Sequence, residues 1–453
     1  MTMQAALDAL SSLLGNRLSR SKSDLDLHGR SEAWFAPAPP AAVAYPRNTA
    51  EVSAILKLCH AHGMPVVAFG RGTSLEGQTL AGPQMLTLDF RDMAQVLQIN
   101  DADMDVVIQP GVTREALNTE LRATGLMFPV DPGADATLGG MAMTRASGTT
   151  AVRYGTMRDN VLALEVVLAD GRIIRTGTRA RKSSAGYDLT GLFVGSEGTL
   201  GIVTELTLRL HGQPEAVSAA ICAFDTLETA VNAVIDTIQL GLPMARIEFI
   251  DPLAARAINA YAGADFPEKP HLLVEFHGAE AGVAQTAATF GEIARDHGAL
   301  DFKWATDADE RRALWTMRHN AYYACLNLKP GARAITTDIC VPISRLAQAV
   351  EETAADIRDS GLLGPIVGHV GDGNFHSLLL IENDADMIRA KEVAARMSER
   401  ALALGGTVTG EHGIGIGKKS YMPAEHGEAW AVMGALKAAL DPTGLLNPAK
   451  LVP

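Results

Sequence analysis

The chain has 453 residues, of which 47% are hydrophobic and 20% are charged, and its formal net charge at pH 7 is −13. A chain of this length and composition can bury more than one hydrophobic core, so we expect at least two domains. An acidic chain without a basic tract lacks the positive footprint of nucleic-acid-binding proteins, and we expect no nucleic-acid partner.

The N-terminus and the cysteines bear on location. The segment Met1–Leu14 is weakly amphipathic and its basic residues follow it, whereas a secretion signal places positive charge before an apolar core. No apolar run approaches the roughly 20 residues that cross a bilayer, and the four cysteines form no CxxC pair. We expect no transmembrane segment and a cytoplasmic location, with peripheral inner-membrane association left open, or the mitochondrial matrix if the source is eukaryotic.

The first half of the chain alternates helices with short strands. The opening forty residues are expected to be helical, and an Asn48 cap with Glu51 three residues later predicts a helix that ends near His62. Val66–Phe69 reads as a buried strand, and Ala169–Gly171 as the turn of a hairpin. Further short strands are expected at 85–88, 106–108, 164–168 and 172–174.

The second half begins at a boundary predicted at Gln213-Pro214. Helices at 227–240 and 343–360 are expected to alternate with strands at 247–250 and 272–276, as in a second α+β layer. The last helix is expected to end near Leu440, before an irregular tail that begins with Asp441-Pro442-Thr443-Gly444.

Glycine-rich loops suggest a phosphate-bearing cofactor. In Gly70–Gly77, the glycines with Thr73 and Ser74 let backbone amides converge on an anion such as a pyrophosphate. The loop is neither a Rossmann fingerprint, because Leu75 replaces the third glycine, nor a Walker loop. A plain turn would explain this loop alone, but with similar clusters at 131–140, 145–155 and 195–204 a long nucleotide cofactor is the better explanation.

Two glycine-flanked segments, 368–376 and 409–413, suggest a metal site. Two imidazoles and a carboxylate, from His369, His376 and Glu411, are a natural ligand set for a divalent metal such as Zn²⁺ or Mn²⁺. His412, beside the carboxylate, has the chemistry of a proton acceptor.

The spacing of the two histidines requires a bend in the backbone. Seven residues span roughly 10 Å along a helix, and along one strand they put the side chains on opposite faces. Gly371 and Gly373 supply the bend that brings both rings to one ion. The alternative to a metal site is a glycine-rich turn with surface histidines. The alternative enzyme class is a metal hydrolase in which the glycine-rich loops are only structural.

These segments together resemble a known family. The glycine-rich loops are similar to the FAD-binding domain of the vanillyl-alcohol oxidase/p-cresol methylhydroxylase (PCMH) superfamily. The chain from about Gly29 to Leu451 resembles FAD-linked D-2-hydroxyacid dehydrogenases, most closely the cytochrome-type D-lactate dehydrogenases. The segments that carry the resemblance are 69–77, 128–140, 151–160, 193–201, 368–376 and 409–415.

The resemblance implies an α+β fold with three parts. These are a two-subdomain PCMH-type FAD-binding domain with an N-terminal helical segment at 1–213, an α+β substrate or cap domain at 214–430, and a return segment at 431–453. It also implies FAD contacts. These are Gly70, Arg71, Gly72, Thr73 and Ser74 at the pyrophosphate; Pro132, Asp135, Thr137, Gly139, Thr144, Ser147, Thr149, Ala151 and Tyr154 along the flavin and ribityl chain; Glu197, Gly198, Gly201 and Val203 at the adenosine end; and Asn447 near the flavin.

The resemblance further implies how FAD is held and what is oxidised. Relatives that tether FAD covalently use a histidine in the first loop or a cysteine in the second. In this chain the two loops carry Arg71 and no cysteine, so we expect non-covalent FAD. The metal ligands would be His369, His376 and Glu411, and His412 would take the proton as hydride passes to flavin N5. A D-2-hydroxy acid would thereby become a 2-keto acid.

The substrate site is implied in the same way. Arg318 would bind the substrate carboxylate, beside His369, Asn374 and Tyr322, although Asn374 equally fits a role in orienting ligands or in the turn. Thr336 stands where the 2-hydroxyglutarate branch has a lysine, which favours a monocarboxylate such as D-lactate over D-2-hydroxyglutarate and leaves glycolate open. The electron acceptor would be a quinone, cytochrome c or an electron-transfer flavoprotein, and the protein a monomer or homodimer.

Overall fold

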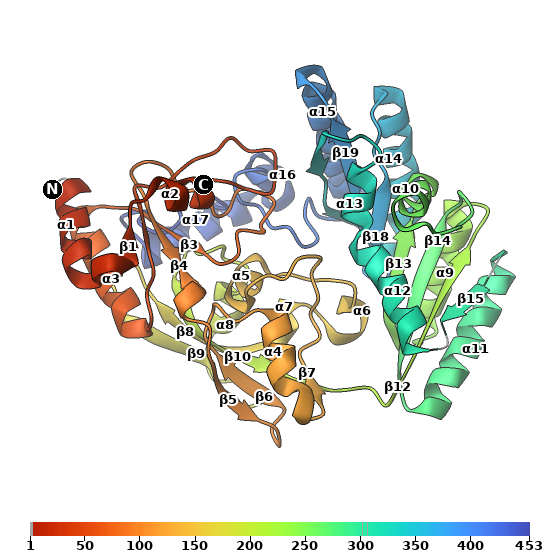
Figure 1. Ribbon diagram of the computed structural model, residues 1–453, viewed down its shortest axis with the longest axis horizontal. Helices are drawn as coiled ribbons and strands as arrows, with labels where there is room; N and C mark the ends of the chain where they lie inside the picture. Colours follow the sequence, from red (N-terminus) through yellow and green to blue (C-terminus); the bar gives the residue numbers. More distant parts are fainter. Residues whose placement is uncertain (1–2, 301, 306) are drawn as a thin grey trace. The chain divides into compact units, whose positions relative to one another are not determined.

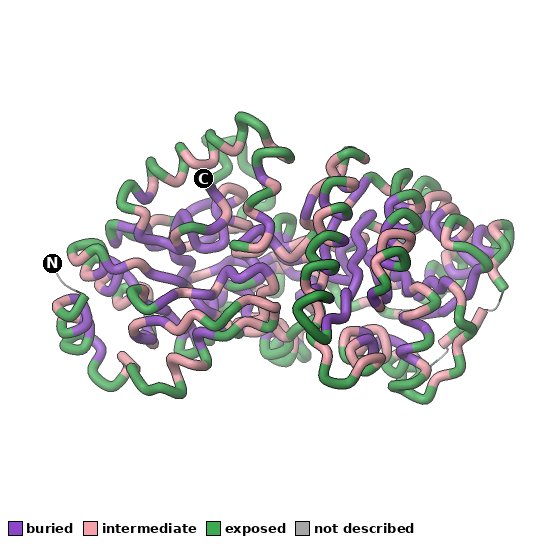
Figure 2. The backbone as a smooth tube through the Cα atoms, turned by 90° about the horizontal axis from the view of Figure 1, so that it is seen from above, coloured by how far each residue is buried: buried purple, intermediate pink, exposed green. Residues whose placement is uncertain are grey.

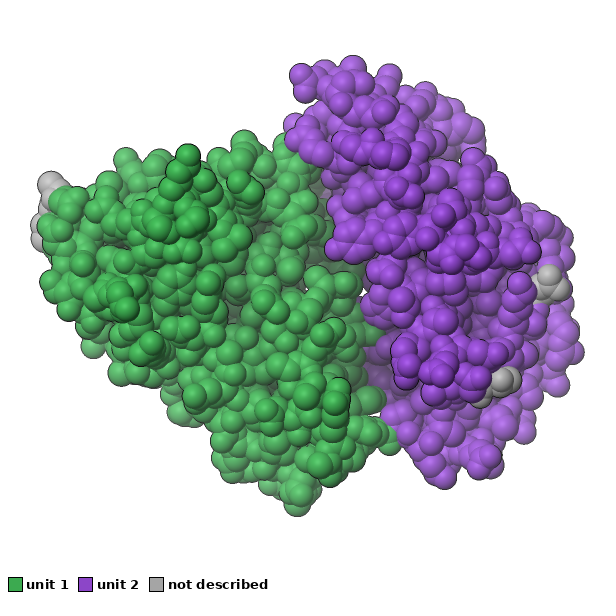
Figure 3. Space-filling view, in the orientation of Figure 1, with its two compact units in different colours: residues 1–147, 155–213, 411–453 green, residues 148–154, 214–410 purple. Residues whose placement is uncertain are grey.

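The computed structural model describes residues 3–300, 302–305 and 307–453, and it divides the chain into two units (Figure 3). Unit 1 comprises Met1–Ser147, Gly155–Gln213 and Glu411–Pro453, and unit 2 comprises Gly148–Tyr154 and Pro214–Gly410. One division falls at Gln213/Pro214 and the last at Gly410/Glu411. The predicted domain limits at 213/214 and 430/431 stay predictions about the family's domains.

Unit 1 begins with a four-stranded sheet in the order β1-β2-β4-β3, in which β4 pairs in parallel with β2 and β3 (Figure 1). Its apolar core joins the helices to the strands, because Leu10 of α1 and Ile55 of α3 are fully buried with Val66 of β3. The elements are α1 Met3–Leu14, β1 Leu18–Ser19, α2 Lys22–His28, β2 Ala42–Ala44, α3 Thr49–His62, β3 Val66–Phe69 and β4 Leu86–Asp89.

Helix α3 begins and ends where the sequence predicted. The side chain of Asn48 accepts a hydrogen bond from the backbone N–H of Glu51, and the helix ends at Gly63. β3 follows directly and delivers the chain into the loop at Gly70. The predicted helix and strand are both confirmed.

The second sheet of unit 1 is antiparallel, in the order β5-β6-β10-β8-β9. β8 and β9 form the predicted hairpin, with Val167 opposite Ile173. Leu206 of β10 packs in a core with Phe128 and Phe193. The elements of this part are β5 Val96–Asn100, β6 Asp105–Ile108, α4 Arg114–Glu120, β7 Leu126–Met127, α5 Leu138–Thr144, α7 Met157–Asn160, β8 Val161–Val167, β9 Ile173–Gly177, α8 Leu189–Phe193, β10 Ile202–Arg209 and β11 His211–Gly212.

The C-terminal segment returns to the first sheet. After α16 (Met422–His426) and α17 (Glu428–Leu440), the backbone N–H of Val66 donates to Leu445 O at 2.8 Å, and that of Asn447 donates to Val66 O at 2.8 Å. Leu445 and Leu446 are buried there. The tail therefore returns to unit 1, where it lies along the free edge of β3.

Unit 2 is built on an eight-stranded antiparallel sheet in the order β15-β12-β14-β13-β18-β19-β16, with β17 paired to β19. Figure 2 shows buried segments inside each unit and exposed segments at its periphery. The elements are α6 Ala151–Tyr154, β12 Ala216–Ala223, α9 Leu227–Gln239, β13 Met244–Ile250, α10 Pro252–Ala262, β14 His271–Gly278, α11 Glu280–Asp296, β15 Phe302–Ala305, α12 Ala308–His319, α13 Ala321–Leu326, β16 Arg333–Thr336, β17 Ile339–Cys340, α14 Leu346–Ser360, β18 Ile366–His369, β19 Asn374–Ile381 and α15 Asp384–Ala403.

Helices cover both faces of this sheet. Leu273 of β14 belongs to an apolar core with residues of α10, α12 and α13. Phe276, which points to the opposite face because side chains alternate along a strand, packs instead on Phe290 of α11. Val367 of β18 and Leu378 of β19 lie on the α10/α12/α13 face, and the histidines of the candidate site project from the same face.

Two further findings concern the helices and the cysteines. Among the described residues, no helix is both long and apolar enough to cross a bilayer. Cys59, Cys222, Cys325 and Cys340 are free thiols. The predicted location stays a prediction.

Candidate active site

The hairpin of β18 and β19 places His369 and His376. His369 ends β18 opposite Asn374, and His376 lies two residues further along β19, so both side chains project from one face. The ring centroids are 5.5 Å apart. Gly373 in the turn has φ +77°, and a Cβ there would lie 2.0 Å from Val341 O, so only glycine fits. The predicted bend is therefore confirmed, and it is a tight hairpin.

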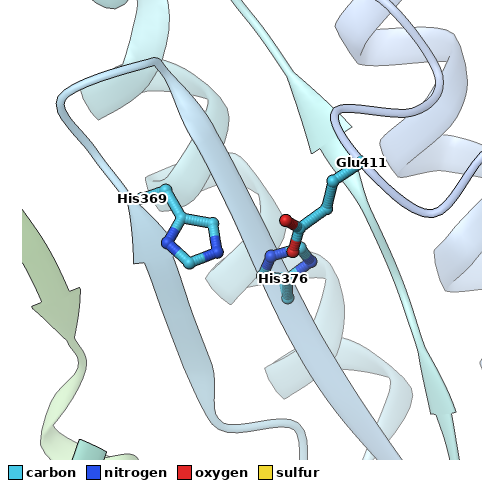
Figure 4. Close-up of side chains that lie close together, drawn as sticks. All are labelled: His369, His376 and Glu411. Atoms are coloured by element: carbon cyan, nitrogen blue, oxygen red, sulfur yellow. The ribbon is translucent and has the colours of Figure 1, made fainter. Parts of the chain in front are cut away.

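Glu411 completes a three-residue group. One ligand atom from each of His369, His376 and Glu411 lies within 4.8 Å of the other two, and Figure 4 shows the three side chains close together. Glu411 follows Gly410, whose backbone N–H donates to Asp338 Oδ2 at 2.9 Å. Two ligands about 2.1 Å from one ion lie at most about 4.2 Å apart. The spacing is close to that of a metal site, and the donor set fits Zn²⁺ or Mn²⁺.

Neighbouring acceptors orient both imidazoles. His369 Nδ1 lies 2.7 Å from Glu248 Oε1, and His376 Nδ1 lies 3.0 Å from the carbonyl oxygen of Thr337. Carboxylate and carbonyl oxygens only accept, so each Nδ1 carries the hydrogen and each Nε2 is the atom that can bind a metal.

Sequence reasoning missed the two buried carboxylates behind this group. Glu248 lies in the middle of β13 and is 0% exposed. Asp338 accepts from Thr409 Oγ1 at 2.6 Å as well as from the backbone of Gly410, so it anchors the segment that leads to Glu411. A charged residue inside an apolar strand, as in Ile247-Glu248-Phe249-Ile250, was the signal that could have found Glu248.

Arg318, predicted to bind the substrate carboxylate, lies in the last turn of α12. Its Nη2 is 2.6 Å from Glu248 Oε2. Its Nε is buried and has no hydrogen-bond partner among the described residues, so a donor is left for an anionic ligand. Arg318 and His369 therefore share one carboxylate.

The other predicted substrate residues also lie in unit 2. Asn374 Nδ2 donates to Asp338 Oδ1 and to Ile339 O, both at 2.7 Å, so its amide nitrogen is already used. Tyr322 is half-buried on α13, with its ring 5.4 Å from that of Tyr323. Thr336 ends β16.

The predicted FAD loops of unit 1 lie against one another. A Cβ at Gly70 would lie 2.1 Å from Thr137 Oγ1, and Arg71 Nη2 is 3.4 Å from Asp135 Oδ2. Ser74 Oγ and Thr79 Oγ1 are buried without a hydrogen-bond partner among the described residues. Unsatisfied hydroxyls beside a glycine-rich loop fit a phosphate-bearing ligand.

The remaining predicted cofactor residues fall into two groups. Unit 1 holds the first group, which comes from all four glycine-rich loops, α5 and the tail. The backbone N–H of Glu197 donates to Met143 O at 2.9 Å, which ties the fourth loop to α5. The residues of this first group are Gly72, Thr73, Pro132, Gly139, Thr144, Ser147, Gly198, Gly201, Val203 and Asn447. Thr149, Ala151 and Tyr154 belong to unit 2, where the Tyr154 hydroxyl lies 2.7 Å from His277 Nδ1.

The Glu197 side chain holds the loop that carries His412. Its carboxylate accepts from the backbone N–H groups of Ile414 at 2.6 Å and Gly415 at 2.8 Å. Gln78 Nε2 donates to the carbonyl oxygen of His412 at 2.8 Å. Burial raises the pKa of Glu197. The carboxylate predicted at the adenosine end is thus used within the protein, on the C-terminal side of the candidate base.

The tail contributes a buried lysine to the same region. Asn447 Nδ2 donates to Glu197 O at 2.6 Å, and Lys450 Nζ donates to Asn447 Oδ1 at 2.6 Å and to Leu80 O at 2.5 Å. Burial lowers the pKa of Lys450 to about 7. No local sequence pattern indicates this lysine's role, because its partners come from distant loops.

Comparisons with known proteins identify the family. The sequence profile of an FAD binding domain matches residues 40–177, and that of the C-terminal domain of FAD linked oxidases matches residues 213–451. The chain belongs to the FAD-linked oxidase family. It is 50% identical over 431 residues to the probable D-lactate dehydrogenase, mitochondrial, of Danio rerio, covering 94% of this chain and 87% of that protein. It is 41% identical over 452 residues to the D-lactate dehydrogenase (cytochrome), mitochondrial, of Arabidopsis thaliana, covering 99% and 80%.

A solved structure supports the same fold. The crystal structure of p-cresol methylhydroxylase with substrate bound matches with a TM-score of 0.79 at 15% identity, covering 98% of this chain and 96% of that chain. The FAD-linked oxidase is therefore an α+β protein with a PCMH-type FAD-binding domain, as predicted. A metal hydrolase with purely structural glycine loops is excluded.

Proposed function

We propose that this FAD-linked oxidase oxidises a D-2-hydroxy monocarboxylate, D-lactate or a close analogue, to the 2-keto acid with a divalent metal. One observation carries the proposal: the ligand atoms of His369, His376 and Glu411 gather within 4.8 Å, and Arg318 shares the Glu248 carboxylate with His369. A metal ligand and a carboxylate-binding guanidinium side by side suit a small acid with an oxygen on C2.

The reaction divides between the chain and its bound groups. When bound, FAD would accept the hydride from C2, and the metal would act as a Lewis acid that lowers the pKa of the C2 hydroxyl. Arg318 would bind the carboxylate through its free Nε, and His412 would take the hydroxyl proton. One hydride and one proton leave, and the C2–O single bond becomes a carbonyl.

The proposed size of the substrate and its proposed configuration at C2 depend on different observations. Thr336 offers no cation for a second carboxylate, and half-buried Tyr322 adds bulk, which favours a monocarboxylate over 2-hydroxyglutarate. The names of the relatives, both D-lactate dehydrogenases, support the D configuration. Glycolate, which lacks a stereocentre, is tested alongside.

The acceptor and the location are proposed from the relatives' names. The plant relative is named a cytochrome-type enzyme, so we propose cytochrome c as the acceptor, with a quinone or an electron-transfer flavoprotein as the alternatives. Both relatives are named mitochondrial, which supports the matrix in a eukaryote, with the cytoplasm as its bacterial counterpart. We propose a monomer or homodimer.

An anaerobic stopped-flow panel tests the proposal. D-lactate should bleach the flavin, whereas L-lactate and D-2-hydroxyglutarate should do so at least about 100-fold more slowly. A chelator should abolish the bleaching, and Mn²⁺ or Zn²⁺ should restore it. Equal rates for both lactate enantiomers, or full bleaching without metal, would contradict the proposal. Denaturation should release the flavin, because its attachment is proposed to be non-covalent.

A further inference from the structure

We infer that Glu248 is a positioning residue for both halves of the substrate site, with one oxygen fixing the metal ligand His369 and the other fixing Arg318. The inference rests on the proposed function, since it needs a metal at His369 and a substrate carboxylate at Arg318. It assigns to one buried carboxylate the relative placement of the cation and the guanidinium.

Strand pairing puts Glu248 in position. β13 pairs antiparallel with β18, with Phe249 opposite Gly368, so Glu248 is the cross-strand neighbour of His369. Its two oxygens have different partners, His369 Nδ1 at 2.7 Å and Arg318 Nη2 at 2.6 Å. The side chain is 1% exposed, so water does not substitute for either partner.

For His369, the contact fixes the tautomer and the ring orientation. The Glu248 oxygen holds the hydrogen on Nδ1, which leaves Nε2 as the metal-binding atom. Removing such a contact typically weakens metal binding about 10- to 100-fold.

For Arg318, the contact is an ion pair that fixes the position of the guanidinium. Nη2 lies 2.6 Å from Glu248 Oε2 without an aligned hydrogen bond, and the buried Nε of the same guanidinium remains a donor for a ligand. Glutamine is neutral and therefore removes the ion pair with Arg318, and aspartate is one methylene too short to reach both partners. Either substitution should therefore impair metal binding and substrate binding together.

The chain offers a closely matched control in Glu275 of β14. This carboxylate is also buried and also joins a histidine to an arginine, with His277 Nε2 at 2.7 Å and Arg246 Nη1 at 3.3 Å. Neither partner belongs to the metal group. Glu275→Gln should therefore disturb an equivalent buried network without weakening metal binding.

The experiment measures Mn²⁺ affinity on the FAD-loaded enzyme after treatment with a chelator, from the free-Mn²⁺ electron paramagnetic resonance signal. Glu248→Gln should raise the Kd about 10- to 100-fold and also raise the KM for D-lactate, whereas Glu275→Gln should leave the Kd unchanged. Arg318→Met should raise the KM without weakening Mn²⁺ binding.

The outcomes separate the two claims. If wild-type protein binds no Mn²⁺, both the proposed function and this inference are contradicted. Tight Mn²⁺ binding that Glu248→Gln does not change would overturn the inference alone. If Glu248→Gln does not fold, wild-type protein loaded with Co²⁺ tests the inference instead. Nuclear magnetic resonance should then show a hyperfine-shifted, slowly exchanging Nδ1–H signal for each metal-bound histidine. Absence of the His369 signal, assigned with a His376→Gln variant, would contradict the role of Glu248.

Discussion

At the scale of single residues, the imidazole of His412 can be removed without breaking the hydrogen bonds that hold its loop. Gln78 donates to the backbone carbonyl oxygen of His412, and Glu197 accepts from the two backbone N–H groups that follow Gly413. The imidazole takes part in none of these hydrogen bonds. His412→Ala should therefore keep the loop and its flavin. We expect flavin reduction by D-lactate to slow by about 10²- to 10⁴-fold, the usual contribution of a general base.

Rapid mixing under anaerobic conditions measures the reduction rate, and the visible absorbance of the purified protein measures flavin content. His426→Ala is the control, because His426 lies at the end of α16 in the same unit and has no assigned role. Loss of flavin together with activity would assign His412 a structural role instead.

The site residues that could be predicted from the sequence lie in local patterns that indicate their role. His369, His376 and Glu411 stand among glycines, and the structure brings them together. Glu248 and Asp338 were missed because their roles depend on partners far along the chain: Glu248 meets His369 only through the pairing of β13 with β18. Strand register of that kind is decided by the folded sheet and leaves little trace in a local pattern.

At the scale of elements, local signals were enough wherever a cap or a turn decided the boundary. The cap of α3 and the hairpin of β8 and β9 lie where predicted. The bend between the two histidines was predicted from Gly371 and Gly373, but not that it joins two paired strands. The two-residue strands β1 and β11 have no local signal, because each exists only through pairing with a distant partner, β2 or β7.

The C-terminal return segment should make stability depend on pH through Lys450. Burial lowers the pKa of this lysine from 10.5 to about 7, so between these values the unfolded chain binds more protons than the folded one. Its contribution to stability is thus fully present above pH 10.5 and is lost as the pH falls to about 7. Wild-type stability should rise relative to Lys450→Met by on the order of a few kcal/mol over this range.

Thermal unfolding midpoints at pH 7.0, 8.0, 9.0 and 9.5 measure the effect as the difference between the two proteins. Only the slope of that difference is diagnostic, since Lys450→Met also leaves the acceptors Leu80 O and Asn447 Oδ1 unpaired at every pH. A difference that does not vary with pH would show that the lysine is not buried as described.

At the scale of the whole molecule, the chain leaves unit 1 and returns to it late. The division at Gln213/Pro214 coincides with a proline in the sequence, which is why a local pattern predicted a boundary there. The return at Glu411 has no such mark, because it falls inside the segment that carries a proposed metal ligand and the candidate base. The family resemblance implied a return segment at 431–453, whereas unit 1 takes in residues 411–453, and no local pattern predicts that earlier start.

Removing the last twelve residues should therefore damage a unit that begins about 440 residues earlier. Truncation after Asp441 deletes the buried Leu445 and Leu446 and the backbone pairing with Val66. Each lost leucine costs about 2 to 5 kcal/mol, so the unfolding midpoint should fall by at least about 10 °C. Flavin content should fall too, because Asn447 no longer binds the carbonyl oxygens of Gln78 and Glu197. Deleting only the exposed Pro453 is the control and should shift the midpoint by no more than about 2 °C. A truncated protein that kept its flavin and its midpoint would show that unit 1 is complete without the tail.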